Sequence, residues 1–328
     1  SISKMSTTIK DSERKILGYA YGNTDWIISP SEGPDFICTH NNKVALGVEV
    51  TEYFVSESIA RLRKIPNYPL ELISEKKFRH KDDRKDFCVE KIKYRPQGDA
   101  SREKEITAII HHPIPMIDKL ERLAAYIDTK TVKYSNYSSN VPAIDLVIFD
   151  ADSAFRFDKF VDLSGSITQS HVRQSSISSP FREIFLVTAS REQKMVCIPM
   201  KAIAFAEEIT IFERLFRCEQ NRVGNPENTK DFFYCLVEVL LRSGFSTAKI
   251  GVEKKEIFLS FGSIDFIYSL KGRQIRSYAF PVPKDEAEPI GKAASKISRR
   301  NMDLSTRIYE LRRSYTACLD LSFPAFVT

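Results

Sequence analysis

Several features that would reveal a function at once are missing from this sequence. Its six cysteines include no CxxC pair, so neither a zinc site nor a disulfide framework is indicated, and a reducing compartment fits. No apolar run reaches the roughly eighteen residues of a membrane-spanning helix, and no charged-then-apolar signal pattern opens the chain. We therefore expect a cytoplasmic protein that has no membrane partner.

Glycine is also scarce, with 12 in 328 residues. Residues 181–328 contain no P-loop, GxGxxG or GxSxG pattern, so no nucleotide cradle or nucleophile elbow is indicated there. Alternating strand-like and helix-like segments in this half predict an α+β accessory domain. Its role stays open, and it could mediate a homodimer or hold a partner protein.

What the sequence does contain is an acidic hairpin, GPDFICTHNNKVALGVEVTEYF, at residues 33–54. Two runs rich in β-branched and aromatic residues flank an Asn-Asn pair that suits a tight turn. If residues 41–43 form a three-residue loop, Asp35 lies opposite Glu49 on the same face of the hairpin. A two-residue loop would shift the register by one and put the two acids on opposite faces.

In the three-residue register the acids share their face with Gly47 and Thr51, and the small Gly47 leaves space beside the carboxylates. Two adjacent carboxylates repel each other unless a cation lies between them, and Mg²⁺ is a cation that binds one or two carboxylates together with water or phosphate oxygens. Such a metal can polarise a phosphodiester and lower the pKa of a bound water. The alternative is a pair of solvated acids at the rim of a sheet.

Pro34-Asp35, thirteen intervening residues and Glu49-Val50-Thr51 resemble the motif of the PD-(D/E)XK nuclease superfamily. The resemblance covers roughly residues 11–150. It implies an α/β, restriction-endonuclease-like three-layer core, Mg²⁺ or Mn²⁺ held by Asp35 and Glu49, and cleavage of nucleic acid, with DNA favoured over RNA. Thr51 would line the site, but it stands where the family usually has its lysine.

Some members of the superfamily recruit that lysine from the helix after the hairpin, and such a helix is predicted here. Val55, Ile59 and Leu62 recur at helical spacing, whereas Arg61 and Lys64 belong to a charged stripe. We expect Lys64 to orient the attacking water and Arg61 to contact phosphate, because a guanidinium does not give up a proton. The alternative is an ordinary solvated stripe.

The family pattern also places an acid on the first helix. Residues 9–22 predict that helix, with Asp11 or Ser12 as its N-cap and Gly22 at its end. Glu13 is its only glutamate, and the resemblance makes it a candidate third metal ligand. The helix dipole alone would also favour a glutamate in a first turn.

The remaining segments predict the organisation of the chain. Residues 1–161 form the nuclease-like domain, with a polar insertion at about 66–105. An amphipathic helix at 115–127 and a buried central strand at 143–152 complete its core. The Ser-rich residues 162–180 predict a loop or linker that leads into the accessory domain.

The formal net charge of +6 is unevenly placed. Residues 61–105 hold fourteen Lys or Arg against nine acids, and residues 292–313 hold seven against two. Basic patches attract a phosphate backbone, although solvated helix faces carry similar charge. The sequence thus predicts a metal-dependent nuclease, by family analogy a restriction or anti-phage factor. The alternative is a catalytically inactive nuclease-fold module that binds nucleic acid or protein.

Overall fold

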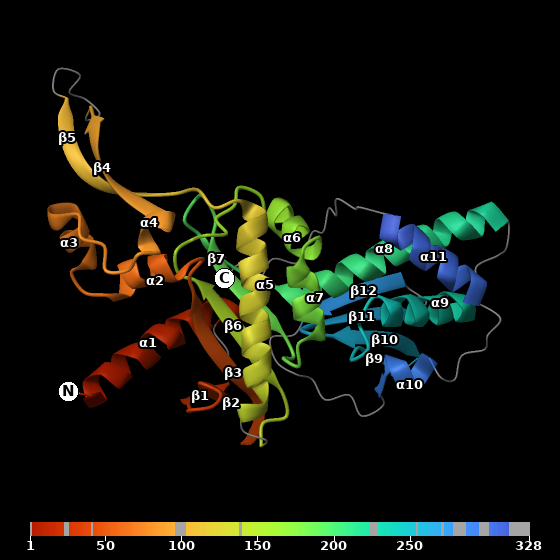
Figure 1. Cartoon of the computed structure of the whole chain (residues 1–328). Helices are drawn as coiled ribbons and strands as arrows, with labels where there is room; N and C mark the ends of the chain where they lie inside the picture. The colour runs from red at the N-terminus through yellow and green to blue at the C-terminus, as the bar shows by residue number, and fades with distance from the viewer. Residues whose placement is uncertain are drawn as a thin grey trace.

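The structure is a computed structural model, shown in Figure 1. It describes residues 2–22, 26–40, 42–95, 103–137, 140–223, 229–253, 255–269, 272–277, 287–294 and 302–314. The chain is a mixed α/β protein, as the sequence predicts, with a six-stranded sheet, a five-stranded sheet and a two-stranded ribbon in this part of the chain. None of the described helices has the length and apolar character needed to cross a membrane.

The six-stranded sheet has the order β1-β2-β3-β6-β7-β8. Its strands are β1 (Ile27–Pro30), β2 (Phe36–His40), β3 (Lys43–Tyr53), β6 (Ile144–Asp150), β7 (Ile184–Ala189) and β8 (Met195–Pro199). The pairs β3–β6 and β6–β7 are parallel, and the outer pairs are antiparallel. The predicted central strand is confirmed, because β6 lies inside the sheet and is buried on both faces.

Helices cover both faces of this sheet. On one face, α1 (Ile2–Tyr21) packs on the apolar side of the hairpin that the sequence predicts. That side consists of Phe36, Cys38, Leu46, Val48 and Val50. On the other face lie α5 (Met116–Lys133), α6 (Phe160–Thr168) and α7 (His171–Ser178), and a short 3-10 turn, η1 (Tyr134–Asn136), follows α5.

The predicted three-residue loop of the acidic hairpin is wrong, but the register at its acidic end is the predicted one. His40 pairs with Lys43, so the loop has two residues, 41–42. A β-bulge follows, in which β3 advances by two residues while β2 advances by one, and Ala45 is the extra residue. The bulge cancels the shift that a two-residue loop introduces, so Phe36 faces Val48.

Gly47 is needed where it stands, for a different reason than the sequence suggests. A Cβ at this position would lie 2.5 Å from the ring of Pro34 and 3.1 Å from the side chain of Val141. The predicted open space beside the carboxylates is therefore filled by Pro34, the residue immediately before Asp35. Gly47 thus lets the start of β2 lie directly against β3.

The first helix begins earlier than predicted. It starts at Ile2 rather than after an N-cap at Asp11 or Ser12, and it ends at Tyr21 as expected. Glu13 therefore lies in the interior of the helix, so the N-terminal helix dipole does not account for it.

The Ser-rich residues 162–180 do not form the predicted loop. They form most of α6 and α7, whose apolar side chains Leu163, Ile167, Val172 and Ile177 are all buried. Four well-spaced apolar residues are enough to fasten two short helices against a sheet, although the segment is polar overall. The strands that follow, β7 and β8, belong to the same sheet as β6.

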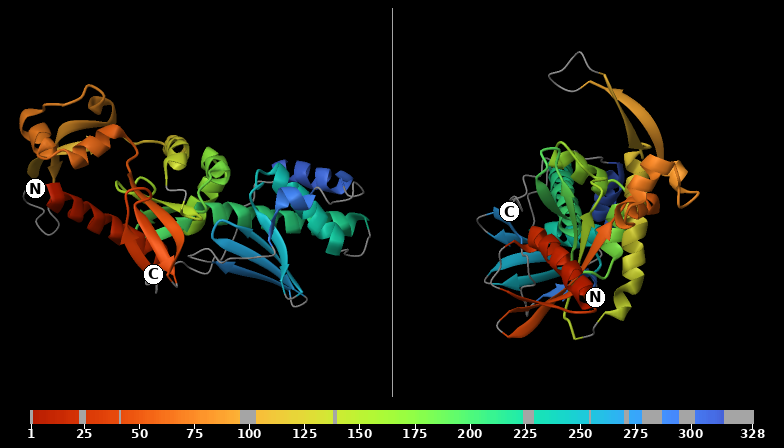
Figure 2. Two further views of the ribbon diagram at one scale, coloured as in Figure 1. Left: turned by 90° about the horizontal axis from the view of Figure 1, so that it is seen from below. Right: turned by 90° about the vertical axis from the view of Figure 1, so that its left-hand side faces the viewer.

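The insertion after β3 consists of small helices and a ribbon. Its elements are α2 (Glu57–Lys64), α3 (Tyr68–Glu75), α4 (Asp83–Asp86), β4 (Phe87–Tyr94) and β5 (Lys104–His111). The sequence predicts that the insertion ends at about residue 105. In the structure it ends later, because β5 continues to His111. The ribbon projects away from the rest of the molecule, as Figures 1 and 2 show.

The C-terminal half carries the second sheet, in the order β12-β11-β10-β9-β13. Its elements are α8 (Met200–Val223), α9 (Thr229–Arg242), β9 (Lys249–Glu253), β10 (Glu256–Phe261), β11 (Ile264–Ser269), β12 (Gly272–Ser277), β13 (Glu288–Pro289), α10 (Ile290–Ala294) and α11 (Met302–Ser314). This half contains both helices and strands, as the sequence predicts. The basic C-terminal segment contains α10 and α11, and residues 295–301 between them lie outside the described part.

A buried carboxylate joins the two sheets. Glu183, directly before β7, accepts hydrogen bonds from the backbone N–H groups of Lys201 and Ala202 at the start of α8. It also accepts both the backbone and the hydroxyl hydrogen bond of Ser263, between β10 and β11. A Cβ at Gly262 would lie 2.5 Å from this carboxylate. The long helix α8 is therefore held at its first turn against both sheets.

Candidate functional site

Asp35 lies just before β2 and uses both carboxylate oxygens. Its Oδ2 accepts the backbone N–H of Val50 at 3.0 Å, and its Oδ1 accepts from Lys10 Nζ at 2.8 Å. The N–H of Val50 is open to a side chain because β2 begins at Phe36 and pairs there with Val48, so β3 continues past the last pair. The length difference between the two strands therefore places the Asp35 carboxylate beside the middle of β3.

Glu49 projects from β3 towards α5 and is largely buried. Its Oε1 accepts a hydrogen bond from Lys130 Nζ at 3.1 Å, and both side chains are about 15% exposed or less. Burial raises the pKa of Glu49, and the negative charge of Asp35 raises it further. Tyr137, which follows η1, also hydrogen-bonds to Glu49. The two predicted ligands are thus close enough to interact electrostatically.

Lys10 connects the third predicted ligand, Glu13, with Asp35. Its Nζ lies 3.1 Å from Glu13 Oε2 and 2.8 Å from Asp35 Oδ1. Burial alone would lower the pKa of Lys10, but the two carboxylates raise it. Helix α1 therefore brings an acid and a cation to the hairpin, and the cation balances both acids.

Thr51 lies two residues after Glu49 and therefore on the same side of β3. Its hydroxyl shares a short hydrogen bond with the hydroxyl of Tyr126, and the Tyr126 hydroxyl also donates to the Glu52 carbonyl. Tyr126 and Lys130 are four residues apart on α5, so they lie on one face of that helix. Helix α5 thus lines the row formed by Glu49 and Thr51.

The two cations predicted from the helix after the hairpin bind elsewhere. Lys64 forms an ion pair of 2.9 Å with Glu52, which points to the opposite side of β3 from Thr51. Arg61 donates to the buried carboxylate of Asp83 from Nε at 3.0 Å and from Nη2 at 2.6 Å. The structure therefore does not bring Lys64 or Arg61 to Glu49, although the buried face of their helix is as predicted.

The acids at the end of the central strand have structural contacts. Asp150 accepts hydrogen bonds from the N–H groups of Ala154 and Phe155 and from the Thr188 hydroxyl. Burial raises the pKa of Asp150 to about 6. Asp152 accepts the backbone N–H of Val55 at 3.2 Å. Asp150 thus caps the turn that follows the strand, and Asp152 bonds to the segment after β3.

The donor set at the hairpin has the chemistry of a Mg²⁺ or Mn²⁺ site, since Glu13, Asp35 and Glu49 offer hard oxygen ligands. As placed, however, no three acidic, histidine or cysteine side chains of the described residues are grouped closely enough to hold a metal ion. The ammonium group of Lys10 lies between Glu13 and Asp35 instead. Glu13 Oε2 is buried and has no well-aligned hydrogen bond. A divalent cation bound by these two acids would take the place of Lys10.

Sequence reasoning missed Lys130, Tyr126 and Tyr137. Tyr126 lies on the helix that the sequence predicts at 115–127, whereas Lys130 lies beyond its predicted end, because α5 continues to Lys133. Lys130 is 81 residues from Glu49 in the chain, and nothing local links the two.

Comparison of the chain with protein-family models, with curated proteins and with solved structures finds no match.

Proposed function

We propose that this chain is a Mg²⁺- or Mn²⁺-dependent nuclease of the PD-(D/E)XK type, with a restriction-endonuclease-like core. The observation that supports the proposal most is that two lysines hold the three candidate acids at the hairpin: Lys10 contacts Glu13 and Asp35, and Lys130 contacts Glu49. This arrangement unites the acids of the hairpin with the acid of the first helix. The other parts of the proposal, a role in restriction or anti-phage defence and a cytoplasmic location, rest on the sequence alone: the first on the resemblance of the motif, the second on the cysteine pattern and the lack of a signal pattern.

In this proposal Asp35 and Glu49, with Glu13, would hold the cation, which would take the place of the Lys10 ammonium group between Glu13 and Asp35. A bound Mg²⁺ or Mn²⁺ would supply Lewis-acid chemistry at the phosphate and a water of lowered pKa. Lys130 takes the role that the family gives to its motif lysine. Its Nζ is 3.1 Å from Glu49, so it is within reach of a water held beside that carboxylate.

Lys10 and the two tyrosines prepare the site. Lys10 keeps the acids from repelling each other before a metal binds, because its ammonium contacts both Glu13 and Asp35. Tyr126 holds the hydroxyl of Thr51, which lines the row beside Glu49. These contacts keep the acidic side chains in place without a metal.

A second candidate function is a catalytically inactive module that binds nucleic acid or protein through the same fold. The contacts of Lys10 and Lys130 favour it, because these lysines already balance the charges that a metal would balance. The two functions differ in one measurable property, which is metal binding.

We expect Mn²⁺ to raise the melting temperature of the protein. A ligand that binds only the folded state stabilises it by RT ln(1 + [L]/Kd), about 2.7 kcal/mol at a concentration of 100 Kd. Differential scanning fluorimetry from 0 to 10 mM Mn²⁺ (roughly the range of weak carboxylate sites) measures the shift. The variant Asp35→Asn should lose it. An unchanged melting temperature of the parent across this range supports the inactive module instead.

We expect Lys130→Ala to lower the maximal rate of cleavage by about tenfold to a hundredfold, because the loss of a group that positions water acts on the chemical step. Lys64→Ala is the matched control, since Lys64 is a lysine paired with Glu52 on the other side of β3. It should leave the rate unchanged. Single-turnover cleavage of a fluorescent duplex by both variants tests this. A slow Lys64→Ala and a normal Lys130→Ala would return the role to the helix after the hairpin.

A further inference from the structure

The ribbon of β4 and β5 stands apart from both larger sheets. It is a separate two-stranded sheet in which Phe87 pairs with His111 and Tyr94 with Lys104. Its outer half is exposed, and Ile92, Tyr94 and Ile106 lie on one face of it. Figure 2 shows the ribbon extending away from the body of the molecule. A two-stranded ribbon is marginally stable by itself, so its base must hold it in place.

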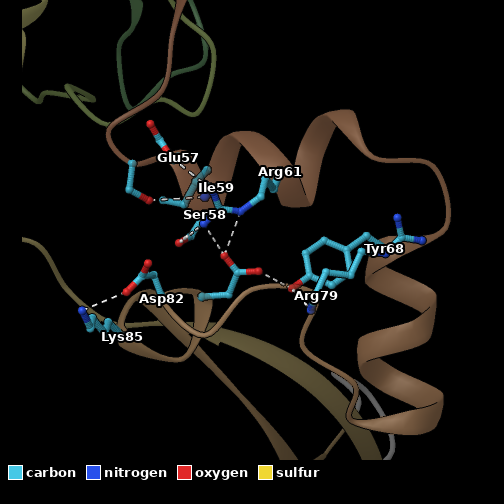
Figure 3. Close-up of polar contacts among 10 residues, drawn as sticks. Glu57, Ser58, Ile59, Arg61, Tyr68, Arg79, Asp82 and Lys85 are labelled. Carbon is cyan, nitrogen blue, oxygen red and sulfur yellow. Dashed lines mark hydrogen bonds and ion pairs between the residues drawn. The ribbon is translucent and has the colours of Figure 1, made fainter.

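The base of the ribbon is a buried polar cluster, which Figure 3 shows. Asp83, fully buried at the start of α4, accepts hydrogen bonds from Arg61 of α2 and from the Tyr68 hydroxyl of α3. The guanidinium of Arg79 lies 5.5 Å from the centre of the Tyr68 ring and forms an ion pair with Glu71. One carboxylate therefore ties together the three helices that support the ribbon.

An apolar cluster lies beneath these contacts. Leu62, Tyr68, Leu72 and Phe87 are buried together, so α2 and α3 pack on the first residue of the ribbon. The base of the ribbon is therefore supported by α2 and α3, which share a small apolar core with it.

Several of the described cations around this base form no ion pair, although Lys77 and Lys81 interact electrostatically with Glu71 and Asp82. The acids Asp82, Asp83 and Glu71 are each in an ion pair. Among the described residues, five exposed cations of this region form no ion pair: Arg63, Lys76, Lys77, Lys81 and Arg84. Three of them, Lys76, Lys77 and Lys81, belong to the connection between α3 and α4. We call these three residues the basic turn.

We propose that the ribbon and the basic turn form a docking surface for duplex DNA. The ribbon enters the major groove, and the basic turn contacts the phosphate backbone beside it. The fit rests on two properties: a major groove of B-DNA about 12 Å wide admits a two-stranded β-ribbon, and unpaired lysines bind phosphate with release of counterions. This inference deepens the proposed nuclease function by naming its substrate class, but the docking surface does not include the metal site.

The same geometry argues against duplex RNA as the partner. The major groove of A-form RNA is deep and narrow, and protein side chains cannot read it. The ribbon carries exposed Ile92, Tyr94 and Ile106, so its surface suits contact with base edges in an open groove as well as with phosphate.

The test is equilibrium binding of a fluorescent 20-base-pair DNA duplex (two helical turns, roughly) by anisotropy in EDTA, so that neither metal nor cleavage contributes. The variant Lys76→Gln, Lys77→Gln, Lys81→Gln should bind at least about tenfold more weakly, and its plot of log K against log salt should be shallower by up to about three units. The matched control is Lys159→Gln, Lys194→Gln, Lys249→Gln, which removes the same charge from exposed lysines elsewhere. It should bind as the parent does.

The ribbon is tested separately by Tyr94→Ala with Lys104→Ala, a pair of facing residues on the outer half. This variant should weaken DNA binding at least about threefold without loss of melting temperature, because both side chains lie far from the apolar cluster. Equal weakening by the basic-turn variant and its lysine control would show that net charge alone is responsible. Equal affinity of the parent for duplex RNA, or no affinity for duplex DNA, would also overturn the proposal.

Failure of this inference is distinguishable from failure of the nuclease proposal. A protein that shows the Mn²⁺ shift but binds no DNA keeps the metal site and loses the docking surface. A protein that binds DNA through the basic turn but shows no Mn²⁺ shift keeps the docking surface as part of the inactive module.

Discussion

Glu49→Gln is expected to lower metal-dependent cleavage at least about a hundredfold, which corresponds to about 2.7 kcal/mol or more of transition-state stabilisation. The substitution keeps the shape of the side chain and removes the charge that would bind the cation. The amide oxygen of Gln can still accept the hydrogen bond of Lys130, so the fold should be kept. The measurement is the rate of duplex cleavage in Mg²⁺ and in Mn²⁺, with the melting temperature as the check on folding.

The matched control for this result is Glu52→Gln. Glu52 lies three residues further along the same strand, is partly exposed and pairs with Lys64. It should cleave at the rate of the parent. A Glu49→Gln variant that cleaves as fast as Glu52→Gln would place the catalytic site elsewhere in the chain.

Asp145→Ala is expected to destabilise the fold by about 3–5 kcal/mol, because it removes the carboxylate that pairs with a buried guanidinium. Asp145 is fully buried in β6 and pairs with Arg182 through both carboxylate oxygens. It also accepts the hydroxyl of Tyr21 from α1 at 2.6 Å and the N–H of Glu183 at 3.0 Å. One side chain thus ties the central strand to α1 and to the segment that leads into β7.

The free energy of unfolding is measured by urea titration with circular dichroism, and Asp158→Ala is the control. Asp158 forms an exposed ion pair of 2.7 Å with Arg191, and such pairs contribute about 0–1 kcal/mol. The two variants remove the same side chain from a buried and from an exposed pair. Losses of equal size would show that Asp145 contributes no more than a surface charge.

In the acidic hairpin, the sequence predicts the register at the acidic end correctly but not the length of the loop. Alternation of apolar residues does not choose between the two loop lengths, and the facing of Phe36 and Val48 is expected only for the three-residue loop. The structure has this pairing, although its loop has two residues. The loop is one residue shorter than expected, because the length of the turn and the register of the strands are separate properties. A bulge at Ala45 separates them, and whether a bulge forms depends on which face of the whole sheet must be buried.

The Ser-rich helices α6 and α7 show the opposite limit. Their composition suggests a linker, yet Leu163, Ile167, Val172 and Ile177 are buried against the sheet. Composition averages over a segment, whereas a short helix needs only one apolar residue per turn on the correct side. The many polar residues of this segment therefore make it resemble a linker, although its few apolar residues are buried.

The sequence by itself determined the strands and helices whose burial repeats along one element: β3, the central β6 and the amphipathic α5. It placed Asp35 and Glu49 on one face only for a three-residue loop, and the bulge at Ala45 restores that register although the loop has two residues. Only the tertiary structure decided which cations reach them. Lys10 and Lys130 arrive from helices on opposite faces of the sheet, while Lys64 and Arg61, although closer in sequence to Glu49, bind Glu52 and Asp83. The physical reason is that periodicity reports the buried side of an element, whereas a contact between distant side chains depends on how whole helices pack on the sheet.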